Sequence, residues 1–265
     1  MPAVTRRMAA ISVLLMSSGV LAGCGSGGHA AGTSTRAAAA AKSSPSHAAT
    51  SAAGAHTTGS LAQAQAKAKA YARAVNLRAA DLPGFKVSSA HEHASGERHL
   101  ELELLHCVGP TSATRALAEA GSGDYERHIS IASVSVSSEV TVAQTPALAA
   151  KELAAYRSGR LPACLSRYFG KLLASQKDHG ASVSPVSTRK GSPPAPGTTG
   201  SFGLRFTATV TLHGLRIPLY VDILGFVDRS AEVSLLVTGI PVPFPAAAEE
   251  RLFLLLLARA RAHSI

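Results

Sequence analysis

The clearest pattern in the chain is an alternation of apolar and polar residues in its C-terminal third. Residues 202–212 place apolar side chains at every even position, and residues 215–223 place them at every odd position. Successive residues of a strand point to opposite faces, so both segments are predicted strands with one apolar face. A two-residue turn at His213–Gly214 would pair Phe206 with Val221 and place both apolar sets on the same face.

A third strand and a closing helix complete this part of the chain. Residues 231–237 alternate in the same way, and a three-residue turn near Asp228–Ser230 would keep their apolar side chains on the shared face of an antiparallel meander. Pro245 suits the first turn of a helix, and the apolar run Leu252–Leu257 indicates that the helix is mostly buried. It is too short to span a membrane, so we expect it to cover the sheet in an α+β arrangement.

The middle of the chain contains another predicted strand, followed by a helix. From Ile129 to Val142 the valines share one parity and mostly polar residues occupy the other, which predicts a half-buried strand. Thr145 can cap a helix, and Pro146 fits its first turn. We expect this helix to run towards Leu165 and to be broken into two pieces at Pro162.

The preceding segment is less regular. A helix is predicted over Gln63–Val75, and a turn follows at Asp81–Gly84, where proline and glycine redirect the chain. Residues 99–107 fit either a strand or a helix, and we favour the helix because Glu and Leu are good helix formers. The stripe expected on one face of the first helix consists of Ala66, Ala70, Tyr71 and Val75.

The start of the chain has the three parts of an export signal. Residues 1–7 carry two positive charges, residues 8–20 are apolar but too few to cross a bilayer as a helix, and small residues precede Cys24. The segment Leu21–Cys24 resembles the lipobox of bacterial lipoproteins. This resemblance implies cleavage before Cys24, diacylglycerol on its thiol, and attachment of the protein by fatty acyl chains such as palmitate to the extracytoplasmic face of the cell membrane. The alternative is an ordinary secretory signal peptide.

A low-complexity segment separates this signal from the rest of the chain. Residues 24–59 consist almost entirely of Gly, Ala, Ser, Thr and His, so they cannot offset the entropy of ordering by burying large side chains. We therefore expect a signal peptide over 1–23, a lipidated and disordered linker over 24–59, and a single extracytoplasmic domain over 60–265.

The cysteine count fits an oxidising compartment. The chain has three cysteines, and lipidation of Cys24 would leave Cys107 and Cys164 as an even pair. We predict that these two form a disulfide bond; the alternative is two separately buried thiols.

The net charge of +10 is smaller in the predicted domain, because four of the 26 basic residues lie in the signal and the linker. The remaining 22 basic residues against 16 acidic ones are a mild bias, which argues against a nucleic-acid partner. This bias would suit anionic lipid head groups or acidic wall polymers, although we favour basic residues spread over solvated faces.

Few residues suggest chemistry. The segment His91-Glu92-His93, with His99 and His106 nearby, could ligate a metal ion, although we favour a solvated polar loop. No Gly-x-Ser-x-Gly motif is present, so we nominate no catalytic residue, and we expect no cofactor. The polar face of the strand at 202–212 could line a ligand groove, or it could simply face solvent, which we favour. That face consists of Arg205, Thr207, Thr209 and Thr211.

Three stretches resemble a group of actinobacterial lipoproteins of unknown role. They are residues 78–84, residues 134–145 with the following helix that ends at 161–165, and the proline-rich entry to the last helix. This group in turn resembles the PsbP-like lipoproteins and the extracellular sensor domains of mycobacterial serine/threonine kinases. The resemblance implies an α/β/α sandwich with an antiparallel sheet, and it brings no catalytic motif.

Taken together, the sequence favours a membrane-anchored lipoprotein of the cell envelope. Its domain is expected to be a non-enzymatic binding or sensor-like module for a protein or an envelope component. The alternatives are an envelope hydrolase and a carrier of a lipid or another small molecule.

Overall fold

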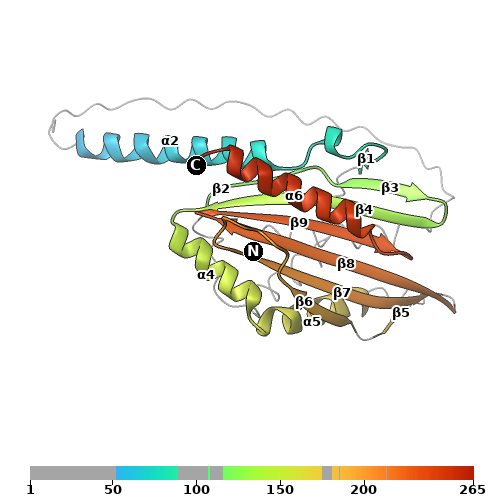
Figure 1. Cartoon of the computed structure of the whole chain (residues 1–265). Helices are drawn as coiled ribbons and strands as arrows, with labels where there is room; N and C mark the ends of the chain where they lie inside the picture. Colours follow the sequence, from blue (N-terminus) through green and yellow to red (C-terminus); the bar gives the residue numbers. More distant parts are fainter. Residues whose placement is uncertain (1–51, 89–106, 108–115, 175–180, 185, 213) are drawn as a thin grey trace, which may run out of the picture.

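In the computed structural model, an antiparallel sheet forms the middle layer, and helices cover both of its faces (Figure 1). The structure describes residues 52–88, 107, 116–174, 181–184, 186–212 and 214–265. This arrangement confirms the predicted α+β class. The elements are α2 (Ala52–Val75), the short 3-10 helix η1 (Ala79–Asp81), β1 (Lys86–Val87), β2 (Ala116–Gly121), β3 (Tyr125–Ile129), β4 (Ala132–Ala143), α4 (Pro146–Arg157), α5 (Arg160–Ala174), β5 (Ala181–Val183), β6 (Ser187–Gly191), β7 (Gly200–Leu212), β8 (Leu215–Asp228), β9 (Ala231–Ile240) and α6 (Ala246–Ala262).

Within the described residues the sheet has nine strands. Its order is β1-β3-β4-β9-β8-β7-β5, and every neighbouring pair is antiparallel. Strand β2 also pairs with β4, and β6 also pairs with β7. Strand β4 therefore pairs along its outer side with β3 and β2, one after the other, and β7 pairs in the same way with β6 and β5.

Two hydrophobic cores lie on opposite faces of the sheet. Helices α4 and α5 cover one core, in which Tyr156 and Phe202 stack with ring centroids 4.2 Å apart. Helices α2 and α6 cover the other, in which Phe226 and Phe253 meet edge to face at 5.6 Å. Because alternate residues of a strand point to opposite faces, the central strands must carry apolar side chains at both parities.

The hairpin of β7 and β8 has the predicted register. Phe206 pairs with Val221, and both side chains lie in the core beneath α4 and α5. Gly214, the second turn residue, has a φ of 82°, in the left-handed region that glycine adopts without strain. The alternation of apolar residues was therefore sufficient to align these two strands.

Strand β9 does not continue the same face, so that prediction was wrong. The turn before it has two residues rather than three, and Asp228 pairs with Ala231. A change of one residue in a turn moves every following side chain to the other face of the sheet. Val233 consequently lies opposite Phe226 in the core under α2 and α6, whereas Leu236 packs against the opposite core.

The strand predicted over 129–142 is in fact two strands joined by a turn. β3 ends at Ile129, and β4 begins at Ala132. The valines of β4 are buried as predicted, but Ser137–Glu139 and Thr141 are buried as well. Strand β4 has helix α2 on one side and α4 on the other, so it is buried on both faces rather than on one.

The helices after β4 begin as predicted but divide at a different place. The Leu148 N–H donates a hydrogen bond of 3.3 Å to the Thr145 hydroxyl, which caps α4 in front of Pro146. The break between α4 and α5 falls at Ser158–Gly159, not at Pro162. Pro162 lies in the first turn of α5, where the N–H group that proline lacks has no partner within the helix.

The first helix is longer than predicted, and its buried stripe is different. It begins at Ala52 rather than Gln63, so it includes residues 52–59 of the expected linker; alanine favours a helix even without an apolar stripe. Tyr71 and Val75 are buried as expected, whereas the exposed Ala66 and Ala70 are not. The other buried positions of its last turns are Ala68 and Ala72.

The C-terminal helix covers the sheet, as predicted. Leu252, Phe253 and Leu256 are buried, but Leu254 within the same apolar run is 48% exposed. The turn at Asp81–Gly84 is also confirmed, since the Phe85 N–H donates to the Leu82 carbonyl and Gly84 has a φ of 82°. The helix favoured over 99–107 lies outside the described residues, apart from Cys107.

Candidate functional site

A pocket of about 460 Å³ lies beside the N-terminal half of α6, against β6, β7 and β8. We call it the α6 pocket. Its volume falls within the range of about 300–1,000 Å³ that is typical of sites for small molecules. The side chains most important for its character are the apolar Leu224, Phe253 and Leu254, and the charged Arg205, Asp222 and Glu249.

The glycines of β6 and β7 leave room for this pocket. Gly191 and Gly203 pair with each other across the two strands, and Gly203 also pairs with Leu224. A Cβ atom at position 203 would lie 3.3 Å from the Leu224 side chain, whereas one at position 191 would meet nothing within 4 Å. Larger residues at these positions would therefore occupy the floor of the pocket.

A row of three charged residues crosses the sheet next to these glycines. Arg189 of β6 lies opposite Arg205 of β7, which lies opposite Asp222 of β8. Arg205 donates two hydrogen bonds to Asp222, from Nε to Oδ1 at 2.7 Å and from Nη2 to Oδ2 at 2.8 Å. This two-point contact fixes the plane of the guanidinium group. The hydrogen bonds to Asp222 also raise the pKa of Arg205, despite its partial burial.

Glu249 contributes a second carboxyl group to the same end of the pocket. It lies in the first turn of α6, with its Oε2 atom 3.8 Å from Nη2 of Arg205. Burial, followed by the charge of Asp222, raises the pKa of Glu249 to about 7, and the charge of Arg205 opposes this rise. The charge of this site therefore changes near neutral pH.

A second pocket, of about 600 Å³, lies at the same edge of the sheet and includes Tyr156 of α4 and Phe202. It shares residues 190–192 and 203–204 with the α6 pocket. The edge formed by the end of β6 therefore separates two hollows. One hollow faces α6, and the other adjoins α4.

Buried acidic groups lie near the Tyr156 side of this edge. Glu139, Glu152 and Glu232 are all nearly inaccessible to solvent. Burial raises the pKa of Glu232 to about 7, and the nearby charge of Glu152 adds to this effect. Burial, followed by the charge of Glu232, also raises the pKa of Tyr156 well above its usual value. Glu232 therefore takes up a proton far more readily than an exposed glutamate.

The structure joins Cys107 and Cys164 in the predicted disulfide bond. This bond attaches residue 107 to helix α5, whose residues lie in the core below the sheet. Cys24 lies outside the described residues, as do His91, His93, His99 and His106, so the lipid site and the metal hypothesis both remain predictions. Within the described residues, no group of three or more His, Cys, Asp or Glu side chains is placed to hold a metal ion.

The predicted polar face of β7 is only partly a groove. Arg205 lines the α6 pocket, but the Thr207 hydroxyl bonds to that of Ser187 on β6, and the Thr209 N–H donates to the Ser184 hydroxyl. These threonines therefore serve the contact with neighbouring strands. Of the four residues in the predicted face, Arg205 alone belongs to the lining of the pocket.

Sequence reasoning missed the two acidic residues of the site. Asp222 interrupts the apolar residues in the middle of β8, and a charge at the centre of a strand buried on both faces was a usable signal. The position of Glu249 in the sequence indicates only an acidic residue in the first turn of a helix, where a negative charge is favourable in any case. Nothing in the local sequence indicates that it meets Arg205 and Asp222, because this depends on how α6 packs across the sheet.

Comparison with protein-family models and with curated protein sequences gives no match for this chain. Among the described residues, none of the helices combines the length and the apolar character needed to cross a membrane.

Proposed function

We propose that this chain is an exported lipoprotein, held at the extracytoplasmic face of the cell membrane by lipid on Cys24. The lipobox-like segment Leu21–Cys24, behind a charged and then apolar leader, supports this proposal. The disulfide bond between Cys107 and Cys164 supports an oxidising compartment as well. Two or three acyl chains would suffice for stable attachment, since a single chain gives only marginal binding.

We further propose that its domain binds a component of the cell envelope in the α6 pocket. The observation that supports this proposal most directly is the group formed by Arg205, Asp222 and Glu249 at one end of a pocket with apolar walls. A pocket that combines apolar walls with a few convergent polar groups is characteristic of a binding site. The helices on both faces of the antiparallel sheet support a PsbP-like fold type, and a sensor-like role would resemble that of the kinase sensor domains.

Intact-mass analysis of the protein from its native host tests the anchor. We expect the leader to be absent and Cys24 to carry diacylglycerol, with or without an additional acyl group on its amino nitrogen. An intact leader together with an unmodified Cys24 would overturn the proposed attachment.

Native mass spectrometry after gentle extraction tests the binding role. We expect a bound small molecule on the wild-type protein and its loss from Gly191→Leu, because a side chain at position 191 projects from the same face of β6 as Arg189. Arg216→Gln, a change at an exposed residue outside the pocket lining, is the matched control and should keep the ligand. A protein that carries no ligand in either form would contradict the binding role.

An envelope hydrolase is the second candidate, and the paired carboxyl groups favour it. A carboxyl group with a raised pKa, such as Glu249, can serve as a general acid beside a second carboxyl group. However, Arg205 binds both oxygens of the Asp222 carboxylate, which leaves that group less free to act as a base. Turnover of an envelope polymer that disappears in Glu249→Gln, with the fold intact, would favour the hydrolase over the binding module.

A further inference from the structure

We propose that the α6 pocket binds an acidic amphiphile, a molecule with one carboxylate or phosphate head group and one acyl chain. This inference rests on the proposed binding function and specifies its ligand. The charged row formed by Arg189, Arg205 and Asp222 would hold the head group, and the apolar wall contributed by α6 would hold the chain.

The charged row contains two arginines but only one carboxylate. Arg189 and Arg205 are directly opposite each other on adjacent strands, an arrangement of like charges that is unfavourable by itself. Asp222 neutralises Arg205, but in the part of the chain that the structure describes no carboxylate lies within ion-pair distance of Arg189. A bound anion would remove this repulsion.

The guanidinium group of Arg205 has free N–H groups that could donate hydrogen bonds to such an anion. Its Nε and Nη2 atoms are engaged by Asp222, and Nη1 makes no hydrogen bond with any other described residue. The side chain is 53% exposed, so its free edge is accessible while the contact with Asp222 fixes its orientation. Planar, fixed guanidinium groups are well suited to carboxylates and phosphates.

An apolar chain has a place to lie next to this head-group position. Leu254 is 48% exposed, although it belongs to a run of buried apolar residues on α6, and with Phe253 and Leu224 it lines the pocket. The glycines at 191 and 203 leave the adjoining floor open. Covering such apolar surface contributes about 25 cal/mol per Å², so an acyl chain would add affinity that a compact anion lacks.

The acidic end of the pocket is not available to a cationic ligand. Asp222 is committed to Arg205, and Glu249 carries a proton over much of the range up to neutral pH. The remaining charged groups that face the pocket are Arg189 and Lys190 of β6 and Glu250 of α6. Binding of an anion should therefore favour protonated Glu249 and should weaken as the pH rises through about 7.

Photo-crosslinking of the full chain in phosphatidylcholine nanodiscs tests the ligand class. The probes are hexadecanoic acid, single-chain hexadecyl phosphate and hexadecanol, each with a diazirine in the middle of the chain. We expect both acidic probes to label peptides that contain Phe253–Leu254 or Leu224, and hexadecanol to label them roughly tenfold less, because it lacks a charge-assisted hydrogen bond.

Two variants separate the head-group contact from the pocket itself. Arg189→Gln removes an exposed charge, so the fold is retained, and labelling by the acidic probes should fall about fivefold or more, with no change for hexadecanol. Gly191→Leu should reduce labelling by all three probes. Arg216→Gln, outside the pocket lining, should leave every probe unaffected. Circular dichroism establishes that each variant is folded.

The outcomes distinguish this inference from the proposed function. Equal labelling by the acids and the alcohol would overturn the acidic head group. No labelling of the pocket by any probe, together with a ligand that Gly191→Leu loses in native mass spectra, would overturn the amphiphile but leave the binding function intact. No labelling by any probe, together with native mass spectra that show no ligand, would contradict both the amphiphile and the binding function. If only one of the two acids labels the pocket, that result identifies the head group.

Discussion

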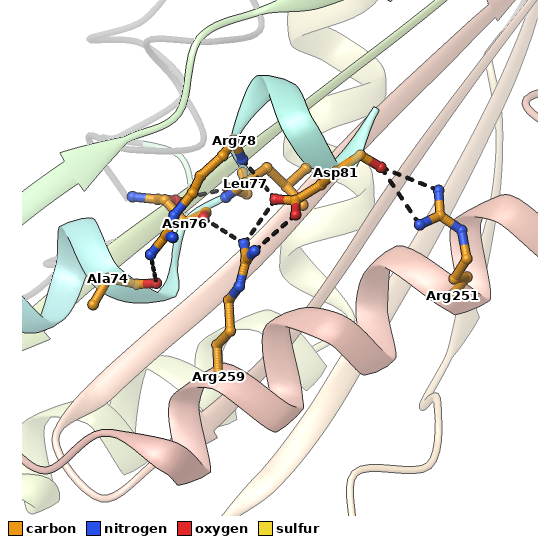
Figure 2. Close-up of polar contacts among 8 residues, drawn as sticks. Ala74, Asn76, Leu77, Arg78, Asp81, Arg251 and Arg259 are labelled. Carbon is orange, nitrogen blue, oxygen red and sulfur yellow. Dashed lines mark hydrogen bonds and ion pairs between the residues drawn. The ribbon is translucent and has the colours of Figure 1, made fainter. Parts of the chain in front are cut away.

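Arg259, in the last turn of α6, donates two hydrogen bonds to the carboxylate of Asp81, which lies 178 residues earlier in the chain (Figure 2). The distances are 2.8 Å from Nη1 to Oδ2 and 2.7 Å from Nη2 to Oδ1. Asp81 also accepts the Arg78 backbone N–H at 2.7 Å, and Arg259 donates to the Asn76 carbonyl at 2.9 Å. This contact therefore attaches the segment after α2 to the C-terminal helix.

Removing one partner of this contact should destabilise the domain. Asp81→Asn and Arg259→Gln each leave a partly buried charge without its partner, so we expect a loss of about 1–3 kcal/mol in the free energy of unfolding. Arg251→Gln is the control, because Arg251 is exposed and reaches only the Asp81 carbonyl, at 3.4 Å. Urea unfolding measures all three. Equal losses in the control and the other two variants would contradict a specific role for Arg259.

The same contact predicts a loss of stability in acid. Burial alone would raise the pKa of Asp81. Hydrogen bonds from the Arg259 side chain and the Arg78 N–H, together with the positive charges of these two arginines, outweigh burial and hold the pKa below its usual value of 3.8. The ionised carboxylate therefore contributes fully to stability above pH 3.8, and this contribution is lost as the pH falls through the lower pKa of the folded state. The difference in urea midpoint between wild type and Asp81→Asn should shrink over that range. A difference that stays constant would contradict this account.

The strands show what a sequence pattern can and cannot predict. Alternation placed Phe206 opposite Val221 correctly, because a two-residue turn was the simplest link between two such segments. The same reasoning failed at β9, where the length of the turn after Asp228 decides the face of every following residue. A strand that is buried on both faces gives apolar residues at both parities, so its pattern does not reveal its register.

The candidate site was accessible from the sequence only in part. Arg205 was marked by its position on the polar face of a clear strand. Its partners required the pairing of β7 with β8 and the position of α6, neither of which leaves a local signal. The disulfide was predictable because it follows from counting three cysteines and assigning one of them to lipid.

Loss of the disulfide bond should lower stability substantially. Cys107 and Cys164 are 57 residues apart, and closing a loop of that length contributes about 4 kcal/mol in the chain-entropy model. The double variant Cys107→Ser, Cys164→Ser should therefore unfold at a lower urea concentration, and dithiothreitol should destabilise the wild type but not this variant. Identical unfolding of the wild type with and without dithiothreitol would contradict the prediction.

Gly225 should not tolerate a side chain. It pairs with Phe202 across β7 and β8, and a Cβ atom there would lie about 2.4 Å from the Phe202 ring and 2.9 Å from the Val233 carbonyl oxygen. Forcing an extra methyl group into this packed core typically costs about 1–3 kcal/mol, so Gly225→Ala should lower the melting temperature. Gly170→Ala is the control at an exposed position of α5, with nothing within 4 Å, and should be neutral or stabilising by up to about 1 kcal/mol. An unchanged melting temperature for Gly225→Ala would show that Phe202 moves aside freely.

Glu232 should make the domain less stable as the pH rises. Burial raises its pKa from 4.5 to about 7, so the folded protein keeps a proton that the unfolded chain releases, and stability decreases between these two pH values before levelling off. Glu232→Gln resembles the protonated form. Its free energy of unfolding should therefore exceed that of the wild type by an amount that grows across this range to something on the order of 3 kcal/mol. Glu250→Gln, at an exposed position of α6, is the control and should change the free energy of unfolding little at any pH. Urea unfolding at several pH values measures the difference. An advantage of Glu232→Gln that is the same at every pH would mean that lost packing or a new amide contact, rather than proton binding by Glu232, distinguishes the two proteins.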